Sequence, residues 1–94
     1  MNDERFMPSE RALCRVVAGE AVVLDLDAGQ YFGLNEVATR VWELLTAETS
    51  LEAIYETLTE EFDAPIDLIR ADVTALLDDL LAKGLVEVAE AKVS

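Results

Sequence analysis

The hydrophobic periodicity of this chain changes at Asn35. Before Asn35, glycine and β-branched residues cluster, as is typical of strands and turns. After Asn35, apolar residues recur at spacings of three and four, as is typical of amphipathic helices. The change predicts an α+β fold of the winged helix-turn-helix type, in which a three-stranded antiparallel sheet within residues 11–34 is followed by three helices.

Two turn signals divide the strand region. Turns at Gly19-Glu20 and at Asp27-Ala28-Gly29 predict an antiparallel meander whose last strand is the segment QYFGL. In the middle strand two sets of residues alternate, Val22, Leu24 and Leu26 with Val23, Asp25 and Asp27. This alternation predicts that one face of the strand is buried. The last strand of a meander has one neighbour, so we expect it to have one open edge.

Three helices are expected at about residues 36–46, 50–62 and 65–83. Asn35 is a favoured N-cap for the first helix. The sequence T-S-L-E at Thr49 to Glu52 matches a capping box and predicts the start of the second helix. Pro65 is tolerated in a first turn and Gly84 is favoured after a last turn, so these two residues are expected to bound the third helix.

The length of 94 residues predicts one small domain over residues 1–94. The terminal segments MNDERFMPSE and LVEVAEAKVS are expected either to add short strands or to fray. The N-terminus shows no signal-peptide pattern, the apolar runs are too short to span a bilayer, and the single Cys14 forms no internal disulfide. These features predict a cytoplasmic protein.

The chain is strongly acidic. Twenty acidic residues against seven basic ones give a formal charge of −13. This charge repels nucleic-acid phosphates and anionic lipid heads, so neither nucleic acid nor a membrane is an expected partner. A DNA recognition helix needs basic residues, yet the third helix offers only Arg70 and Lys83. The charge either attracts a partner or only keeps the domain soluble and monomeric, and the sequence leaves both interpretations open.

The residue inventory argues against catalysis. Histidine is absent and Cys14 is the single cysteine, which removes nearly every metal site and every imidazole-dependent mechanism. Asp25 and Asp27 share a strand face and are interpreted as a solvated pair rather than as an acid and a base. Cys14 is interpreted as a small buried hydrophobe because no base activates it. We therefore expect no enzymatic activity, no metal and no cofactor.

An acyl or peptidyl carrier protein is the alternative function. Carrier proteins are small, acidic and helix-rich, and Ser50 at a helix start is the one superficial candidate for a phosphopantetheine arm. Against it, Ser50 lacks the Asp that precedes the serine of the carrier D-S-L motif, and it lies within the predicted capping box. The front third of the chain is also predicted to be strand rather than helix.

The open edge of the third strand is a candidate binding site. Unpaired N–H and C=O groups let an extended peptide add itself as a further strand, while pockets between strand and helix select its side chains. Gly33 permits close backbone approach, and Tyr31 offers an amphipathic ring to the guest. Phe32 and Leu34 fit a core role equally well, and for them the sequence leaves both roles open.

Three segments of the chain resemble the PqqD-like family, the precursor-peptide recognition elements of ribosomally made, post-translationally modified peptides. The matching segments are LDLDAGQYFGLNEVATRVWELL, TSLEAIYETLTEEFDAP and IRADVTALLDDLLAKGLV, within about Leu13 to Val86. Their most specific motifs are D-x-x-x-G-x-Y-F-G-L-N from Asp25 to Asn35, A-T-R-V-W from Ala38 to Trp42 and D-V-x-x-L-L-x-x-L-x-x-K-G-L from Asp72 to Leu85.

The resemblance implies a protein that binds the leader region of a precursor peptide and presents it to a maturation enzyme. In the family, the leader pairs with the third strand and lies against the third helix. The strand positions that match by motif are Gln30, Tyr31, Phe32, Gly33 and Leu34, and the helix positions inferred from periodicity are Arg70, Val73, Thr74, Leu77 and Leu81. The segment GQYFGLN is most similar to stand-alone lasso-peptide members, which serve a leader-cleaving protease; a radical S-adenosylmethionine enzyme is the alternative partner.

Overall fold

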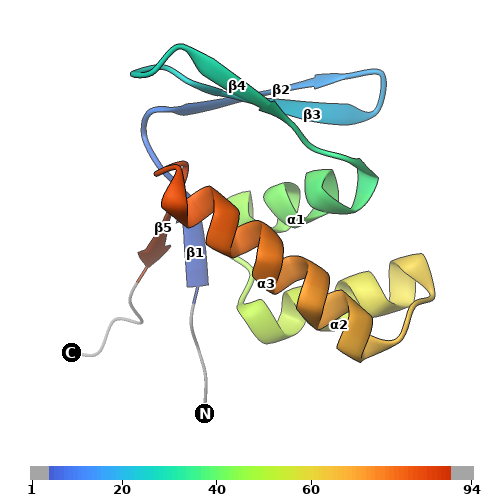
Figure 1. The fold of residues 1–94 in the computed structure, drawn as a ribbon. Helices are drawn as coiled ribbons and strands as arrows, with labels where there is room; N and C mark the ends of the chain where they lie inside the picture. Colours follow the sequence, from blue (N-terminus) through green and yellow to red (C-terminus); the bar gives the residue numbers. More distant parts are fainter. Residues whose placement is uncertain (1–4, 90–94) are drawn as a thin grey trace.

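Residues 5–89, the part of the chain that the structure describes, fold into two antiparallel sheets and three helices (Figure 1). In this computed structural model the elements are β1 Arg5–Pro8, β2 Ala12–Val17, β3 Glu20–Asp25, β4 Gln30–Gly33, α1 Glu36–Thr46, α2 Leu51–Phe62, α3 Ile66–Ala82 and β5 Val86–Ala89. One sheet has the order β2-β3-β4, and the three helices follow it in the chain. This arrangement confirms the predicted α+β fold.

The sheet β2-β3-β4 buries the face that carries Val23 and Asp25. Val23 is fully buried and Asp25 is 5% exposed, whereas Leu26 is 55% exposed. The buried face of β3 is therefore the one that contains an aspartate, and the all-apolar set is turned outward. The interpretation of Asp25 as part of a solvated pair is wrong, because its Oδ1 accepts hydrogen bonds from the N–H groups of Asp27 and Ala28 and lies 3.5 Å from Nε of Arg11.

The N-cap of the second helix is one residue later than Thr49, the N-cap that the predicted capping box implies. Ser50 is the N-cap, and its Oγ accepts a hydrogen bond from the N–H of Ala53. Thr49 instead completes the end of α1, because its N–H donates to the C=O of Leu44 while Glu48 has a left-handed φ of 61°. This 6→1 closure satisfies a carbonyl of the last turn of α1 and uses the Thr49 N–H, which a capping box would need for its bond to Glu52. Asn35 caps α1 as predicted.

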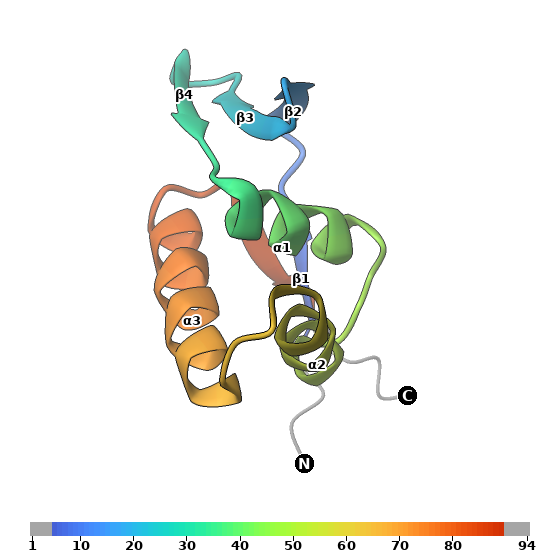
Figure 2. The same ribbon diagram turned by 90° about the vertical axis from the view of Figure 1, so that its right-hand side faces the viewer.

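The helices share one core beneath the sheet. Figure 2 shows α1 between the sheet β2-β3-β4 and α2, with α3 along one side. The largest fully buried side chains come from the sheet, from each of the helices and from the segment that precedes β5, and they are Val23, Val41, Leu45, Ile54, Leu58, Val73 and Leu85. Their burial keeps the helices in fixed positions relative to the sheet.

The two ends of the described chain form a ribbon of their own. β1 pairs antiparallel with β5, with Phe6 opposite Val88 and Pro8 opposite Val86. Phe6 is 8% exposed and Val86 2%, so the ribbon is attached to the core by apolar contacts. Of the two outcomes expected for the terminal segments, strand formation is the one observed here; residues 1–4 and 90–94 lie outside the described part. No helix within residues 5–89 is long and apolar enough to span a membrane.

Candidate functional site

The outer edge of β4 has main-chain groups that no other strand in the described part uses. β4 pairs only with β3, with Phe32 opposite Val23 and Gly33 opposite Val22. The N–H of Leu34 donates to the C=O of Ala21, and antiparallel pairs alternate between bonded and non-bonded positions. The main-chain N–H and C=O groups of Phe32 therefore face β3, while those of Tyr31 and Gly33 point outward.

The side chains of β4 divide between the two faces of the sheet. Phe32 lies half-buried on the inner face against the core, and Leu34, just beyond the strand, is 5% exposed. Tyr31 is on the outer face and is 72% exposed. A Cβ at Gly33 would meet open space. The sequence left the roles of Phe32 and Leu34 open, and the structure places Leu34 in the core and Phe32 at its margin.

A buried hydroxyl fixes the end of β4 on α1. Thr39 is 6% exposed, and its Oγ1 accepts a hydrogen bond from the N–H of Ala21 and donates one to the C=O of Leu34. These bonds, of 3.0 and 3.2 Å, join the first turns of α1 to both strands of the β3-β4 pair. The open edge is therefore presented by a strand whose end is anchored to the helical core.

A hollow of about 290 Å³ continues from the end of β4 between α1 and α3. Its lining residues are Asn35, Val37, Ala38, Val41, Asp72, Val73, Ala75 and Leu76. Val37 and Leu76 are half-buried side chains packed against the core. A strand added at the β4 edge would thus direct its inward side chains toward an apolar floor that has Asn35 and Asp72 at its rim.

Three flanks of α3 have different surroundings. Val73 and Leu77, two of the predicted contact residues, are 1% and 3% exposed and belong to the core. Helical spacing places Asp72, Leu76, Asp79 and Lys83 on one flank beside these buried residues. Lys83 shows that this flank faces β4, because its Nζ lies 5.1 Å from the ring centroid of Phe32. Leu76 is a candidate contact that was not predicted from the sequence, although helical spacing places it on the same flank as Asp72 and Lys83.

The other predicted helix positions, Arg70, Thr74 and Leu81, share the opposite flank by the same spacing. The guanidinium of Arg70 lies 5.2 Å from the ring centroid of Tyr55 and 3.7 Å from a carboxylate oxygen of Glu52, both on α2. Val73 and Leu77 lie between this flank and the one that faces β4. A part for Arg70, Thr74 and Leu81 in peptide binding stays a prediction.

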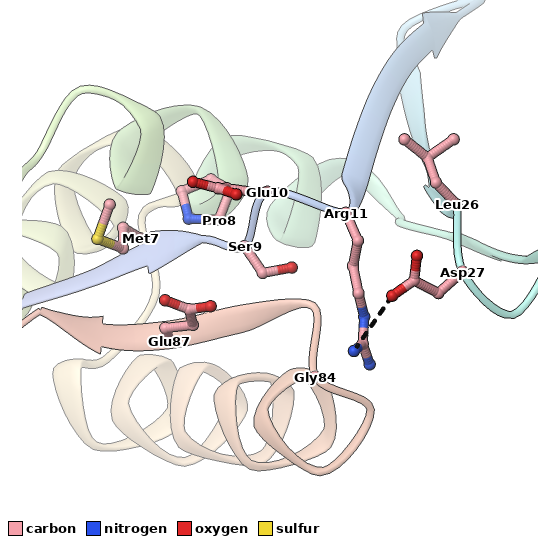
Figure 3. Close-up of a pocket in the computed structure, with 9 residues that line it drawn as sticks. All are labelled: Met7, Pro8, Ser9, Glu10, Arg11, Leu26, Asp27, Gly84 and Glu87. Carbon is pink, nitrogen blue, oxygen red and sulfur yellow. Dashed lines mark ion pairs between the residues drawn. The ribbon is translucent and has the colours of Figure 1, made fainter.

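Arg11 connects the β3-β4 turn to the end of α3. Its Nη2 donates to the C=O of Lys83 at 3.0 Å, and its Nη1 lies 3.8 Å from Oδ2 of Asp27 (Figure 3). The open hollow around it, of about 720 Å³, is lined by Met7, Pro8, Ser9, Glu10, Arg11, Leu26, Asp27, Gly84 and Glu87. Because Arg11 bridges the turn that precedes β4 and the C-cap of α3, it fixes the relative positions of these two elements.

Two observations concern metal-binding groups and the thiol of Cys14 within the described residues. Within residues 5–89 no group of three or more His, Cys, Asp or Glu side chains could hold a metal ion. Cys14 lies half-buried on the inner face of β2, where burial, and then the charge of Glu43, raise the pKa of its thiol. A raised pKa lowers the thiolate fraction at neutral pH and so makes Cys14 a poor nucleophile.

Comparison with known proteins identifies the family of this fold. The family model described as coenzyme PQQ synthesis protein D (PqqD) matches residues 20–86. The chain belongs to the PqqD family. This membership confirms the resemblance, and the PqqD match includes β3, β4 and the three helices. A comparison with curated proteins gives no significant match.

Two solved structures share the fold of this PqqD-family chain. One is described as TbiB1 in complex with the TbiA(beta) leader peptide; it is 29% identical with a TM-score of 0.82, and the match covers 92% of this chain and 99% of that one. The other is described as lasso peptide synthetase B1 complexed with the leader peptide; it is 23% identical with a TM-score of 0.81, and the match covers 88% of this chain and 98% of that one.

Proposed function

We propose that this protein is a non-catalytic adaptor that binds the leader region of a ribosomally made precursor peptide as an added strand on β4. The observation that carries the proposal is the open edge, where the main-chain groups of Tyr31 and Gly33 point outward beside the hollow at Leu76. Main-chain pairing supplies affinity, and pockets for alternate side chains supply selectivity. The whole chain, residues 1–94, acts as one domain in this proposal and is monomeric when free.

The guest class is supported by a relative that shares nearly the whole fold. TbiB1, 29% identical to this chain, is described in complex with a leader peptide. The GQYFGLN segment, which is most similar to stand-alone lasso-peptide members, favours a leader-cleaving protease as the maturation enzyme. A radical S-adenosylmethionine enzyme is the alternative partner. In either case the adaptor raises the local concentration of precursor near the enzyme.

The peptide-binding surface that we propose combines the β4 edge with the near flank of α3. Gln30 to Gly33 form the pairing strand, Leu34 and the buried Val73 and Leu77 support it, and Leu76 contacts the guest directly. Arg70, Thr74 and Leu81 extend the proposed surface only if the guest also crosses the far flank of α3. Substitutions on the two flanks separate these two paths.

The direct test is a titration of the full chain, labelled with ¹⁵N, with synthetic peptides that tile any short precursor peptide found encoded near its gene. We expect one peptide to shift the amide signals of Tyr31, Gly33 and Leu76 and to slow hydrogen exchange at the Gly33 N–H, because that group gains an acceptor. Amide shifts confined to α2, or no binding by any tile, would contradict the proposal.

A carrier function makes a different prediction for the same protein. The hydroxyl of Ser50 is engaged as the N-cap of α2, and no observation favours its loading with a phosphopantetheine arm. Intact-mass measurement after incubation with a phosphopantetheinyl transferase and coenzyme A separates the two functions. We expect an unchanged mass, and a gain of one phosphopantetheine group that Ser50→Ala removes would establish the carrier function instead.

A further inference from the structure

We infer that Lys83 is a specificity contact that binds a carboxylate side chain of the guest where the paired segment passes Phe32. The inference rests on the proposed function and adds a chemical requirement: the leader carries an Asp or Glu on the side that faces the helices. We use the word groove for the proposed peptide-binding surface between the β4 edge and the flank of α3 that faces it. Lys83 is the C-cap residue of α3, and it lies at the end of this groove where β4 begins. The site is therefore part of the groove and separate from its apolar hollow.

The ammonium group of Lys83 is held across the groove by contacts on both sides. Its Nζ lies 2.8 Å from Oδ1 of Asp79, one turn back on α3, and 5.1 Å from the ring centroid of Phe32 on β4. The C=O of the same residue accepts the hydrogen bond from Arg11. These contacts restrain the backbone and side chain of Lys83 before a guest arrives, which lowers the ordering cost of a new contact.

The same ammonium group keeps unused donors. A lysine has three N–H donors, and among the described residues its Nζ has one acceptor, Asp79. The side chain is 35% exposed, so it is not enclosed by the protein and remains accessible to a further acceptor. A guest strand on β4 covers this group and replaces water as the acceptor.

The charged group of this flank that lies over the Phe32 ring is the Lys83 ammonium, which favours an anionic rather than a cationic guest group at that position. Lys83 is the basic residue of the flank, and its charge lies at the β4 end, while Asp72 borders the apolar hollow further along α3. A guest carboxylate above Phe32 would share the Lys83 ammonium with Asp79. A guest ammonium at that position would meet Lys83 as a like charge.

The strand register limits where the acidic residue stands in the guest. Guest residues opposite Phe32 share its inner face, and those two positions away in either direction do so as well. One of these inward positions lies at Leu34, beside the hollow that takes an apolar anchor. We therefore expect the acidic residue two or four positions from the apolar anchor, since the guest residues that carry both must face inward.

Selection from a phage-displayed library of random 12-residue peptides tests the inference and does not require the leader sequence. The baits are the full chain, Lys83→Glu, Lys83→Met, and Arg5→Glu as a control with the same change of charge at an exposed position in β1, outside the proposed surface. We expect the wild type and Arg5→Glu to enrich Asp or Glu two or four positions from an apolar residue. Lys83→Glu is expected to enrich Lys or Arg there, and Lys83→Met to show no charge preference.

Affinities of one selected peptide then give the magnitude. Replacing its acidic residue by Gln should weaken binding to the wild type about fivefold, as for a partly exposed ion pair, and leave binding to Lys83→Met unchanged. Equal acidic enrichment by the wild type and Lys83→Glu, in variants with unchanged thermal melts, would overturn the inference. Selected peptides that still bind Gly33→Pro would instead count against strand addition, so the two failures are distinguishable.

Discussion

Arg11 and Gly84 are in direct contact, and the side chain of Arg11 occupies the space that any Cβ at position 84 would need. An alanine Cβ at this position would overlap Nη2 of Arg11 and lie 3.0 Å from its Cζ, and Gly84 also has a left-handed φ of 74°. The guanidinium in this place donates to the C=O of Lys83, next to Gly84 in the chain. The absence of a side chain at position 84 thus lets one residue join the sheet to the end of α3.

Gly84→Ala is expected to lower the free energy of unfolding by about 2 kcal/mol, from backbone strain and from loss of the Arg11 hydrogen bond to the C=O of Lys83 when the guanidinium shifts. The matched control is Gly29→Ala, which has a similar φ of 70° but open space at its Cβ. It should cost only about 1 kcal/mol, the strain alone. Urea unfolding measures both values. The double variant Arg11→Met, Gly84→Ala should lose less stability than the sum of the losses of the two single variants. Strict additivity would contradict the contact.

Gly33→Pro is expected to abolish leader binding while the fold remains. Proline removes the outward N–H of Gly33 and adds a ring at the edge where the guest would pair. Gly33→Ala keeps this N–H and places its Cβ in open space, so it should bind as the wild type does. Isothermal titration with the binding peptide, beside a circular dichroism melt, checks both variants. Retained binding by a folded Gly33→Pro would exclude pairing at this position.

Leu76→Ala and Leu77→Ala are expected to separate binding from stability. Leu76 is half-buried at the hollow, so its truncation should weaken leader binding about tenfold, or roughly 1.4 kcal/mol, with a small change in stability. Leu77 is 3% exposed, and its truncation should cost about 2 to 5 kcal/mol of folding free energy instead. Denaturant titration and binding isotherms of both variants measure the two effects. Comparable binding losses in folded Leu76→Ala and Leu77→Ala would mean that both side chains contact the guest.

Cys14 is expected to react slowly with iodoacetamide at pH 8. Burial and the nearby Glu43 carboxylate raise the pKa of its thiol, so the folded protein contains less thiolate at this pH than the unfolded chain. The expected rate is at least about tenfold lower than in concentrated urea, because half-burial also limits access. Mass spectrometry over a time course measures both rates. Equal rates would show that the thiol is neither shielded nor shifted.

The sequence predicted the elements of the fold because local signals agree with tertiary structure there. The change of periodicity at Asn35, the cap on α1 and the turn before β4 all depend on neighbours within a few residues. The pairing of β1 with β5 was not predicted, because that contact joins opposite ends of the chain and no local pattern encodes it. The burial of Asp25 depends on Arg11, which lies just before β2, and the alternation within β3 cannot reveal that contact.

The strand part of the candidate site was predicted from local signals, whereas its helix part depends on contacts between distant residues. The β4 segment from Gln30 to Gly33 was found as an open edge, since a meander leaves its last strand unpaired on one side. On α3 the helical period selected Val73 and Leu77 as peptide contacts, but both side chains are buried in the core. The period alone does not distinguish which neighbouring flank faces β4. The flank that faces β4 is identified by the contact between Lys83 and Phe32, which are far apart in the sequence.

The ribbon of β1 and β5 has a practical consequence for how the protein can be handled. Arg5 and Ala89 are opposite each other in its register, and Figure 1 places this end of the ribbon away from the sheet β2-β3-β4. A purification tag, a fluorophore or a fused enzyme joined before Arg5 or after Ala89 would therefore leave the β4 edge accessible. The same adjacency allows a short linker to connect the two ends, so that a circularly permuted chain opened at the Ala18-Gly19 turn keeps every helix intact.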